Sequence, residues 1–111
     1  MRVTLEVKTP VYQRNEKGHY IDFKCRDSAI TELEYGIVYT PDKAAYPSLK
    51  DGVLSVKIPW KYNRPMVKTH NMFNTIFDFK EGDNMTFEVK FMGKWETEWG
   101  NGTSWKMTLI H

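Results

Sequence analysis

A cluster of basic and aromatic residues near the middle of the chain carries the clearest chemical signal. Its members are Lys57, Trp60, Lys61, Tyr62 and Arg64. No acidic residue occurs between Asp51 and Asp78. Cationic side chains can follow the phosphates of a nucleic acid while aromatic faces accept its unstacked bases, each worth about 1–3 kcal/mol. The cluster therefore favours binding of single-stranded nucleic acid. A strand end with ordinary surface lysines and a core tryptophan would give the same pattern.

Residues 84–110 contain three of the four tryptophans and are predicted to form one long β-hairpin. Apolar and polar residues alternate along its first half, which is typical of a strand with one buried face. Gly100-Asn-Gly102 is the turn signal between the two strands. A three-residue loop with Gly102 in the left-handed position would set Trp95 opposite Met107, and we expect this register because it pairs apolar with apolar side chains.

The predicted hairpin is longer than a compact domain of this size. A strand from Met85 to Trp99 would extend about 50 Å, whereas a compact domain of this length has a radius of gyration of about 13 Å. Either Gly93 bends the strand or the tip projects, and in both cases Trp99 and Trp105 are expected beyond the core. The alternative is that the tryptophans are core or staple residues. The candidate binding residues of this arm are Lys94, Trp95, Trp99, Trp105 and Lys106.

The composition fits one globular domain. The chain has 111 residues, enough for an independent core. A net charge of +2 does not by itself imply a polyanionic partner, and no apolar run approaches a membrane span. The first eight residues alternate like a strand and do not resemble a signal peptide. The lone Cys25 excludes an internal disulfide, fits a reducing cytoplasm, and is expected to be an inert buried thiol.

The alternation of apolar and polar residues predicts a mostly β chain with one domain over residues 1–111. The strands are expected over residues 3–8, 19–25, 33–39 and 54–60, the first two either separate or one bent strand. Pro10 should end or kink the first strand. Residues 40–52 are predicted to be a surface loop with one helical turn at 43–46. Spacings of three and four predict a single short helix within residues 66–79, running from Met66 or Thr69 to Ile76. A small antiparallel barrel with this helix between its third and fourth strands is therefore expected.

The second half of the chain carries a series of spaced features. A Gly turn at Glu81-Gly-Asp83 precedes a strand that ends in Lys94-Trp95, then a loop with glycines and a last strand with an aromatic start at Trp105. This series resembles the OB-fold of bacterial single-stranded DNA-binding proteins. The resemblance implies an OB-like barrel and a role in DNA replication, with Trp60 and Trp95 stacking on bases from the ends of adjacent strands. The chain lacks the acidic C-terminal tip through which that family recruits other replication proteins.

We therefore expect sequence-tolerant, non-catalytic binding of single-stranded DNA. Trp99 and Trp105 would extend the stacking surface, and the basic residues of both stretches would contact phosphates. A metal-dependent nuclease is the enzyme alternative, because Asp42, Glu88 and Lys90 follow the residue order of such a site. The same short pattern recurs at Glu6-Val-Lys8, and no histidine spacing or phosphate-binding Gly loop supports catalysis. No enzyme, metal or cofactor is expected.

A protein partner is the main alternative to a nucleic acid. Aromatic residues and arginine are favoured at interface hot spots, so the hairpin arm would also suit a small phage-type inhibitor or adaptor that binds a host protein. A replication protein as partner and a homodimer are both compatible with the sequence, and no membrane partner is expected. Carbohydrate binding by the tryptophans is disfavoured by the lone cysteine and the missing secretion signal.

Overall fold

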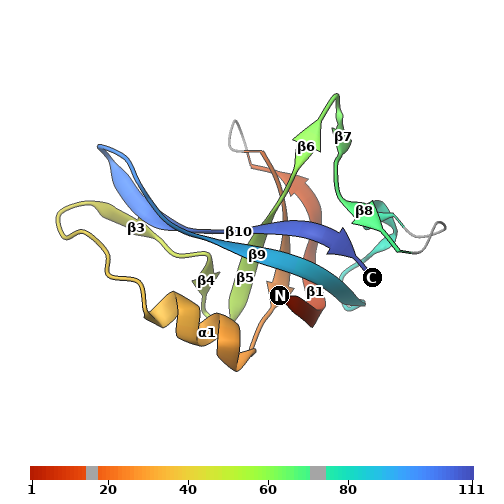
Figure 1. Ribbon diagram of the computed structural model, residues 1–111, viewed down its shortest axis with the longest axis horizontal. Coiled ribbons are helices and arrows are strands. Elements are labelled where there is room, and N and C mark those ends of the chain that lie inside the picture. Colours follow the sequence, from red (N-terminus) through yellow and green to blue (C-terminus); the bar gives the residue numbers. More distant parts are fainter. Residues whose placement is uncertain (15–17, 71–74) are drawn as a thin grey trace.

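In its described residues the chain folds mainly into β-strands, with one α-helix and one short 3-10 helix (Figure 1). The computed structural model describes residues 1–14, 18–70 and 75–111. The strands are β1 (Arg2–Gln13), β2 (His19–Lys24), β3 (Ala44–Tyr46), β4 (Leu49–Lys50), β5 (Val53–Ile58), β6 (Trp60–Lys61), β7 (Arg64–Pro65), β8 (Lys68–Thr69), β9 (Asn84–Glu96) and β10 (Gly100–Ile110). The helices are α1 (Ser28–Tyr35) and the 3-10 helix η2 (Ile76–Asp78).

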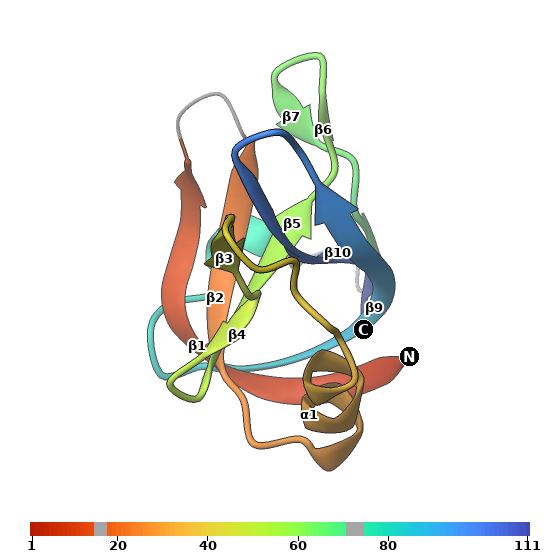
Figure 2. The same cartoon turned by 90° about the vertical axis from the view of Figure 1, so that its left-hand side faces the viewer.

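Five strands are hydrogen-bonded in a closed ring. The order is β1, β2, β5, β10, β9 and back to β1, and every pairing is antiparallel except that of β5 with β10. This last pairing involves one residue pair, Lys57 with Lys106, so the ring is not a clean barrel. Figure 2 shows the ring from the end at which the hairpin projects. The predicted fold class is confirmed in outline: mostly β, a ring of strands, one α-helix and a long C-terminal hairpin among the described residues. The helix was expected between the third and fourth strands, and this position is wrong, because α1 directly follows β2, the second strand of the chain.

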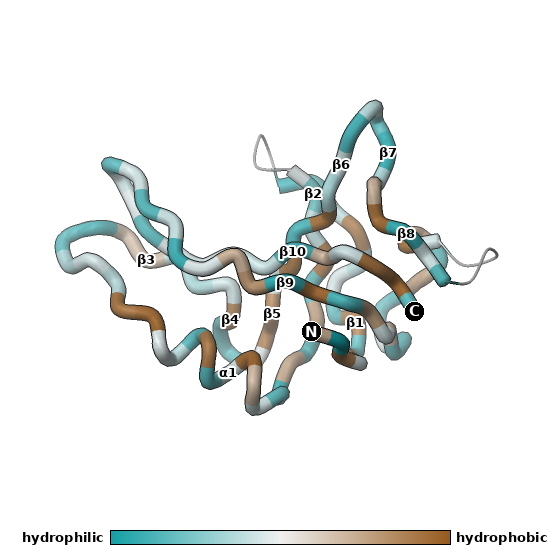
Figure 3. The backbone as a smooth tube through the Cα atoms, in the orientation of Figure 1, coloured by the Kyte–Doolittle hydropathy of each residue, from teal (hydrophilic) through white to brown (hydrophobic). Residues whose placement is uncertain are grey.

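The core fills the inside of this ring with alternate residues from its strands. Val3, Leu5 and Val7 of β1 are buried while their neighbours face solvent, as the period of two requires. Phe23 of β2 stacks on Phe87 of β9 across the ring, with ring centroids 4.6 Å apart. Figure 3 shows apolar residues gathered where the long strands cross and hydrophilic residues at the hairpin tips. The strands predicted over residues 3–8 and 19–25 are confirmed, and β1 continues past Pro10 with shifts in its pairing on either side of residue 9. The strand predicted over residues 54–60 is confirmed only as far as Ile58, where β5 ends, because Trp60 belongs to β6, which pairs with β7 in a separate sheet.

The strand predicted over residues 33–39 is wrong, because α1 occupies residues 28–35. Asp27 caps this helix: its side-chain oxygen accepts a hydrogen bond from the Ile30 amide at 3.0 Å. Ile30 and Glu34, one helical turn apart, form the buried face, while Tyr35 is 82% exposed. The alternation of apolar residues from position 33 therefore has no structural meaning, and the N-cap aspartate was the informative signal.

The helix predicted between Met66 or Thr69 and Ile76 is not found in the described part of this segment. Residues 68 and 69 form β8, which pairs in parallel with the end of β10. Ile76 begins the three-residue η2 and is buried. Residues 71–74 lie outside the described ones. At residues 68 and 69, pairing with β10 takes the place of the expected helix. The helical turn predicted at 43–46 is also wrong, because residues 44–46 form β3 and pair in parallel with β10.

The C-terminal hairpin is confirmed, but its turn and register differ from the prediction. The turn consists of residues 97–99, where the Thr97 hydroxyl oxygen accepts hydrogen bonds from the backbone amides of Trp99 and Gly100. Gly102 lies inside β10, opposite Trp95, so the predicted pairing of Trp95 with Met107 is wrong. Of the two alternatives offered for the long hairpin, an irregularity at Gly93 is found: this residue has a φ of 85°, and the pairing shifts beside it.

Candidate ligand-binding groove

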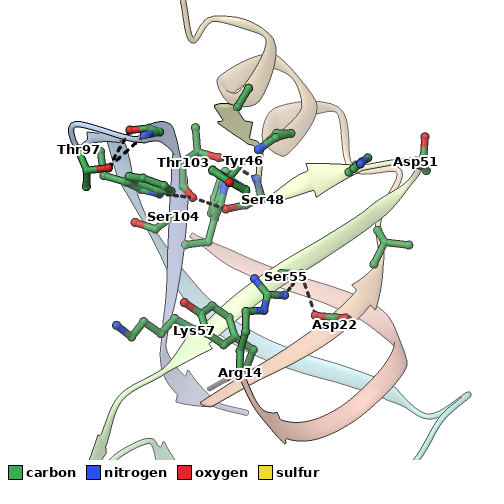
Figure 4. Close-up of a pocket in the computed structure, with 18 of the residues that line it drawn as sticks. Arg14, Asp22, Tyr46, Ser48, Asp51, Ser55, Lys57, Thr97, Thr103 and Ser104 are labelled. Carbon is green, nitrogen blue, oxygen red and sulfur yellow. Dashed lines mark hydrogen bonds between the residues drawn. The ribbon is translucent and has the colours of Figure 1, made fainter. Parts of the chain in front are cut away.

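A groove of about 1160 Å³ lies between the outer face of β2 and β5 and the projecting end of the β9–β10 hairpin (Figure 4). Charged, hydroxyl-bearing and aromatic side chains line it. They include Lys8, Arg14, Tyr20, Asp22, Tyr46, Ser48, Lys50, Asp51, Ser55, Lys57, Trp95, Thr97, Trp99, Thr103 and Ser104. The alternation of β2 and β5 explains this face, because Ile21 and Val56 point into the core while their neighbours point into the groove.

A side pocket of about 590 Å³ adjoins the groove. Lys57, Ser104 and Trp105 line both hollows, so the two adjoin, and together they are called the track. The side pocket is lined in addition by Pro59, Trp60, Lys61, Met66, Met92 and Lys106. A flexible chain-like ligand lying in the groove can therefore continue past Lys57 into the side pocket.

Positive charge is concentrated along this track. Six cationic side chains line the groove and the side pocket, against two carboxylates among the described residues. They are Lys8, Arg14, Lys50, Lys57, Lys61 and Lys106, and the carboxylates are Asp22 and Asp51. The local excess of positive charge is larger than the +2 of the whole chain, so the track is the natural place for an anionic ligand.

A hydrogen-bonded network fixes the floor of the groove. Asp22 accepts hydrogen bonds through the same oxygen, Oδ1, from the hydroxyl groups of Tyr12 and Ser55, both at 2.8 Å. Arg14 donates to the Tyr12 hydroxyl at 2.6 Å and to Ser55 at 3.3 Å, and its guanidinium lies 4.4 Å from the centre of the Tyr20 ring. Burial, followed by the hydrogen bond to Asp22, raises the pKa of Tyr12, so its hydroxyl stays a donor at neutral pH.

Aromatic side chains form the hairpin end of the groove. Trp95 stacks on Tyr46 of β3, with ring centroids 6.0 Å apart and planes inclined by 17°. The Trp95 indole N–H donates to the Thr103 carbonyl at 3.3 Å, which fixes the ring in place. Trp99 lines the same end and is 79% exposed. The structure therefore brings two of the predicted tryptophans together at one end of the groove.

Trp60 lies at the other end of the track, in the side pocket. Its ring stacks on His19, with centroids 3.5 Å apart and planes inclined by 12°, and Phe77 meets it edge-on. One indole face is therefore already covered. The expectation that Trp60 and Trp95 end adjacent strands of the ring is wrong, because β6 pairs with β7 in a separate two-stranded sheet. Tyr62 and Arg64 belong to this small hairpin and are exposed, but neither lines the track.

Two predicted binding residues have other roles in the structure. Trp105 is 1% exposed, and its indole N–H donates to the Glu34 carboxylate at 2.6 Å, so the expectation of an exposed Trp105 is wrong. The turn precedes the glycines of β10, and this position of the turn places Trp105 among the residues of β10 that face the core. Lys94 lies 3.4 Å from a Glu96 oxygen and donates to the Thr40 hydroxyl at 3.1 Å. It does not line the track, since neighbouring strand residues point to opposite faces.

Sequence reasoning missed the contributions of Arg14, Tyr20, Asp22 and Tyr46 to the groove. Tyr20 and Asp22 occupy the polar positions of a correctly predicted strand, so their parity placed them on the outer face. The alternation does not predict which part of the outer surface forms the groove. Tyr46 was assigned to a loop, and only the parallel pairing of β3 with β10 brings it to Trp95.

The residues of the nuclease alternative do not meet. Lys43, next to Asp42, lies 3.4 Å from a Glu96 oxygen at the hairpin tip, whereas Glu88 lies eight residues back along β9, about 26 Å at the usual strand rise. Asp42 and Glu88 therefore cannot share one metal ion. In the part of the chain that the structure describes, no group of three metal-ligating side chains is found. Cys25 is buried as expected, and burial raises the pKa of its thiol.

Comparison with known proteins gives no relative: no protein-family model, curated protein or solved structure matches the chain. Among the described residues, no helix is long and apolar enough to cross a membrane.

Proposed function

We propose that this protein binds single-stranded DNA, without catalysis and with tolerance of sequence, along the groove and its side pocket. The observation that carries the proposal is that cationic side chains and aromatic rings together line the track. Proteins that bind single strands combine a positively charged groove with aromatic platforms, and the outer face of the second and third strands of an OB-type barrel is a common place for it.

The cations suit a phosphate backbone because they are spread along the track. Lys57 lies at the junction of the two hollows, Arg14 is held in place over Tyr20, and Lys61 and Lys106 line the side pocket. Each phosphate that such a residue neutralises releases counterions, which favours binding at low salt. The free thiol of Cys25 fits a cytoplasmic location, where single-stranded replication intermediates occur.

The aromatic residues suit unstacked bases at the hairpin end. Trp99 is exposed, and Trp95 is fixed by Tyr46 and by its hydrogen bond to Thr103. A rigid or exposed indole beside a cationic groove can accept a base at little entropic cost. Trp60 offers at most one face in the side pocket, because His19 covers the other.

Intrinsic tryptophan fluorescence tests the proposal. Oligo-dT at low salt is expected to quench the emission, and a duplex of equal length is expected to quench it far less, because paired bases cannot stack on side chains. Trp99→Ala should remove part of the quenching and weaken binding by about 1–3 kcal/mol, or about fivefold to a hundredfold. Arg26→Ala, an exposed cation outside the track, is the control and should leave quenching unchanged. A folded protein that shows no quenching with oligo-dT would refute the proposal.

A protein partner is the second candidate, and the exposure of the hairpin tip favours it. Trp99 is 79% exposed at the end of a projecting arm, where it could enter a pocket of a host or replication protein as well as stack on a base. The two functions differ in what the lysines do. If a protein is the ligand, Trp99→Ala should abolish its binding while Lys57→Ala has little effect, and no nucleic acid should quench the fluorescence.

A further inference from the structure

Three lysines stand side by side where the ring of strands closes. Lys106 of β10 is paired directly with Lys57 of β5 on one side and with Lys90 of β9 on the other. Each of the three is exposed and has a buried neighbour in its strand, so all three side chains project from the outer face. Neighbouring strands lie about 4.8 Å apart, which places Lys57 and Lys90 about 10 Å from each other. These residues are called the lysine row.

The charges of the lysine row are not compensated. Like charges on directly opposed strand residues repel each other and destabilise a sheet. Elsewhere in the described part of the ring, charged residues that face each other have opposite signs, as in Glu6 with Lys24 and Arg2 with Glu88. No ion pair joins the lysine row to a carboxylate of the described residues, and the Glu88 side chain, two positions along β9, lies 3.3 Å from His111. The repulsion within the row would be relieved by an anionic ligand.

The lysine row is continuous with the track. Two of its members line the side pocket, and so does Met92, which lies two residues from Lys90 on the same face of β9. On the far side of Lys57, the next residue across the sheet is Tyr20 of β2. The Arg14 guanidinium lies 4.4 Å from the centre of the Tyr20 ring. Positive charge therefore extends across β9, β10, β5 and β2 without an intervening carboxylate among these paired positions.

We infer that the lysine row binds successive phosphates of the single strand, so that the ligand leaves the side pocket across β10 and β9 and Lys90 is a further binding residue outside both hollows. The inference rests on the proposed function and extends the path of its ligand. One phosphodiester carries a single negative charge, which cannot balance three ammonium groups, whereas successive phosphodiesters supply one charge each. An ammonium group on a flexible four-carbon stem suits the variable spacing of a single-stranded backbone.

The first test is Lys90→Gln, with Arg26→Gln as the matched control that removes the same charge from an exposed residue between β2 and α1. In a plot of log K for oligo-dT against log salt, Lys90→Gln should make the slope less steep by about 0.7, the value of one phosphate contact. Arg26→Gln should leave the slope unchanged. An unchanged slope for Lys90→Gln, with Lys57→Ala still reducing it, would overturn the inference and leave the proposed function in place. Absence of oligo-dT binding by the wild type would overturn both.

The second test reverses the central charge of the row with Lys106→Glu. This change turns both repulsive pairs into attractive ones, so the Tm of the free protein should rise by a few degrees. The affinity for oligo-dT at low salt should fall by about tenfold or more, because a carboxylate then faces the phosphates. Arg26→Glu, the same reversal away from the row, should not raise the Tm and should weaken binding less. A lower Tm for Lys106→Glu, or a loss of affinity equal to that of Arg26→Glu, would contradict the inference.

A change on the ligand shows which group Lys90 contacts. Oligo-dT with methylphosphonate linkages keeps its bases and length but carries no backbone charge. Lys90→Gln should weaken the binding of ordinary oligo-dT and leave that of the methylphosphonate oligomer unchanged. An equal loss of affinity for both oligomers would mean that Lys90 does not bind phosphate.

NMR of the wild-type protein tests the same contact without any variant. The signals of the Lys90 side-chain ammonium group should shift when oligo-dT is added at low salt, together with those of Lys57 and Lys106. Shifts of Lys57 and Lys106 without a shift of Lys90 would overturn the inference. Inorganic tripolyphosphate is the other source of successive phosphates, and a shift of Lys90 with tripolyphosphate but not with oligo-dT would mean that the row takes a free polyphosphate instead of the strand.

Discussion

At the scale of single residues, the two glycines of β10 explain how the hairpin end of the groove is built. A Cβ atom on Gly102 would lie 2.3 Å from the Tyr46 carbonyl oxygen and 2.7 Å from a ring carbon of Trp95. A Cβ on Gly100 would meet the Tyr46 ring at 2.8 Å. The glycines therefore serve close packing of β3 and Trp95 against β10 rather than a tight turn.

Gly102→Ala should consequently destabilise the protein. The new methyl group meets backbone on one side and a fixed indole on the other, so we expect a loss of about 1–3 kcal/mol in the free energy of unfolding. Gly36→Ala is the matched control, because its Cβ would have an ordinary contact of 3.4 Å and the residue has a φ of −73°. Denaturant melts of both variants give the comparison. A loss below about 0.5 kcal/mol for Gly102→Ala would contradict the packing argument.

Glu96 provides a second prediction at this scale. Its hydrogen bond from Thr40, with further contributions from Lys43 and Lys94, lowers the pKa of its carboxyl group. A lowered pKa in the folded state means that the stabilisation is present above the unfolded pKa and is lost as the pH falls through the folded one. Titration of the Glu96 side chain by NMR should therefore give a pKa below the usual glutamate value of about 4.3. Lys43→Ala should raise it towards that value, and an unshifted pKa in the wild type would show that the cluster does not form in solution.

At the scale of elements, α1 is tied to the hairpin by one buried carboxylate. Glu34 accepts from the Thr103 hydroxyl at 2.8 Å and from the Trp105 indole N–H at 2.6 Å. Thr103 in turn accepts two hydrogen bonds from Ser48, just before β4: the Ser48 amide donates to its hydroxyl oxygen and the Ser48 hydroxyl to its carbonyl oxygen. Three segments that are far apart in the sequence are thus joined at one polar point, and Trp105 is held in the core instead of at the surface.

Removal of this carboxylate should therefore cost more than an average helix substitution. Glu34→Ala leaves buried donors on Thr103 and Trp105 without an acceptor, and we expect a loss of about 1–3 kcal/mol in the free energy of unfolding. Glu34→Gln keeps an acceptor and should lose less. Glu32→Ala, exposed on the same helix, should stay within about 0.5 kcal/mol of the wild type. Equal effects of Glu34→Ala and Glu32→Ala would argue against this anchor.

Strands with one buried and one exposed face could be predicted from the sequence. Short strands that form only by pairing with a distant segment could not. The strict period of two in β1, β2, β5 and β9 reflects a core on one side and solvent on the other, so it can be seen locally. The short strands β3 and β8 exist because β10 offers them its free edge, which nothing in their own residues reveals. Trp105 was predicted to lie beyond the core from the length of the hairpin, whereas Glu34, a distant residue on α1, accepts its indole hydrogen bond and the ring is buried.

The same limit applies to the candidate site. Lys57, Lys61, Lys106, Trp60, Trp95 and Trp99 were named from the sequence and line the track. Arg14 and Tyr46 also line the track but were not predicted, because the position of their segments depends on how the whole ring of strands is assembled. Composition shows which residue types are present, whereas the position of a hollow depends on strand order.

At the scale of the whole molecule, strand order converts a nearly neutral chain into a polarised one. β2 and β5 are neighbours in the ring, and the single pair Lys57 with Lys106 brings β10 beside them. Cations that are far apart in the sequence, from Lys8 to Lys106, thereby line one track. The net charge of +2 conceals this arrangement because acidic residues gather elsewhere, as in the pairs of Glu6 with Lys24 and of Glu96 with Lys43.

The dependence of binding on salt tests this polarisation directly. If the track follows a phosphate backbone, log K should fall linearly with log salt, with a slope of about −0.7 for each phosphate neutralised. Lys57→Ala, at the junction of the groove and the side pocket, should make the slope less steep by roughly one such contact, whereas Trp99→Ala should weaken binding at every salt concentration and leave the slope nearly unchanged. Arg26→Ala should change neither affinity nor slope. A slope that responds equally to Lys57→Ala and Arg26→Ala would mean that the strand is attracted by the total charge of the protein and does not lie in the track.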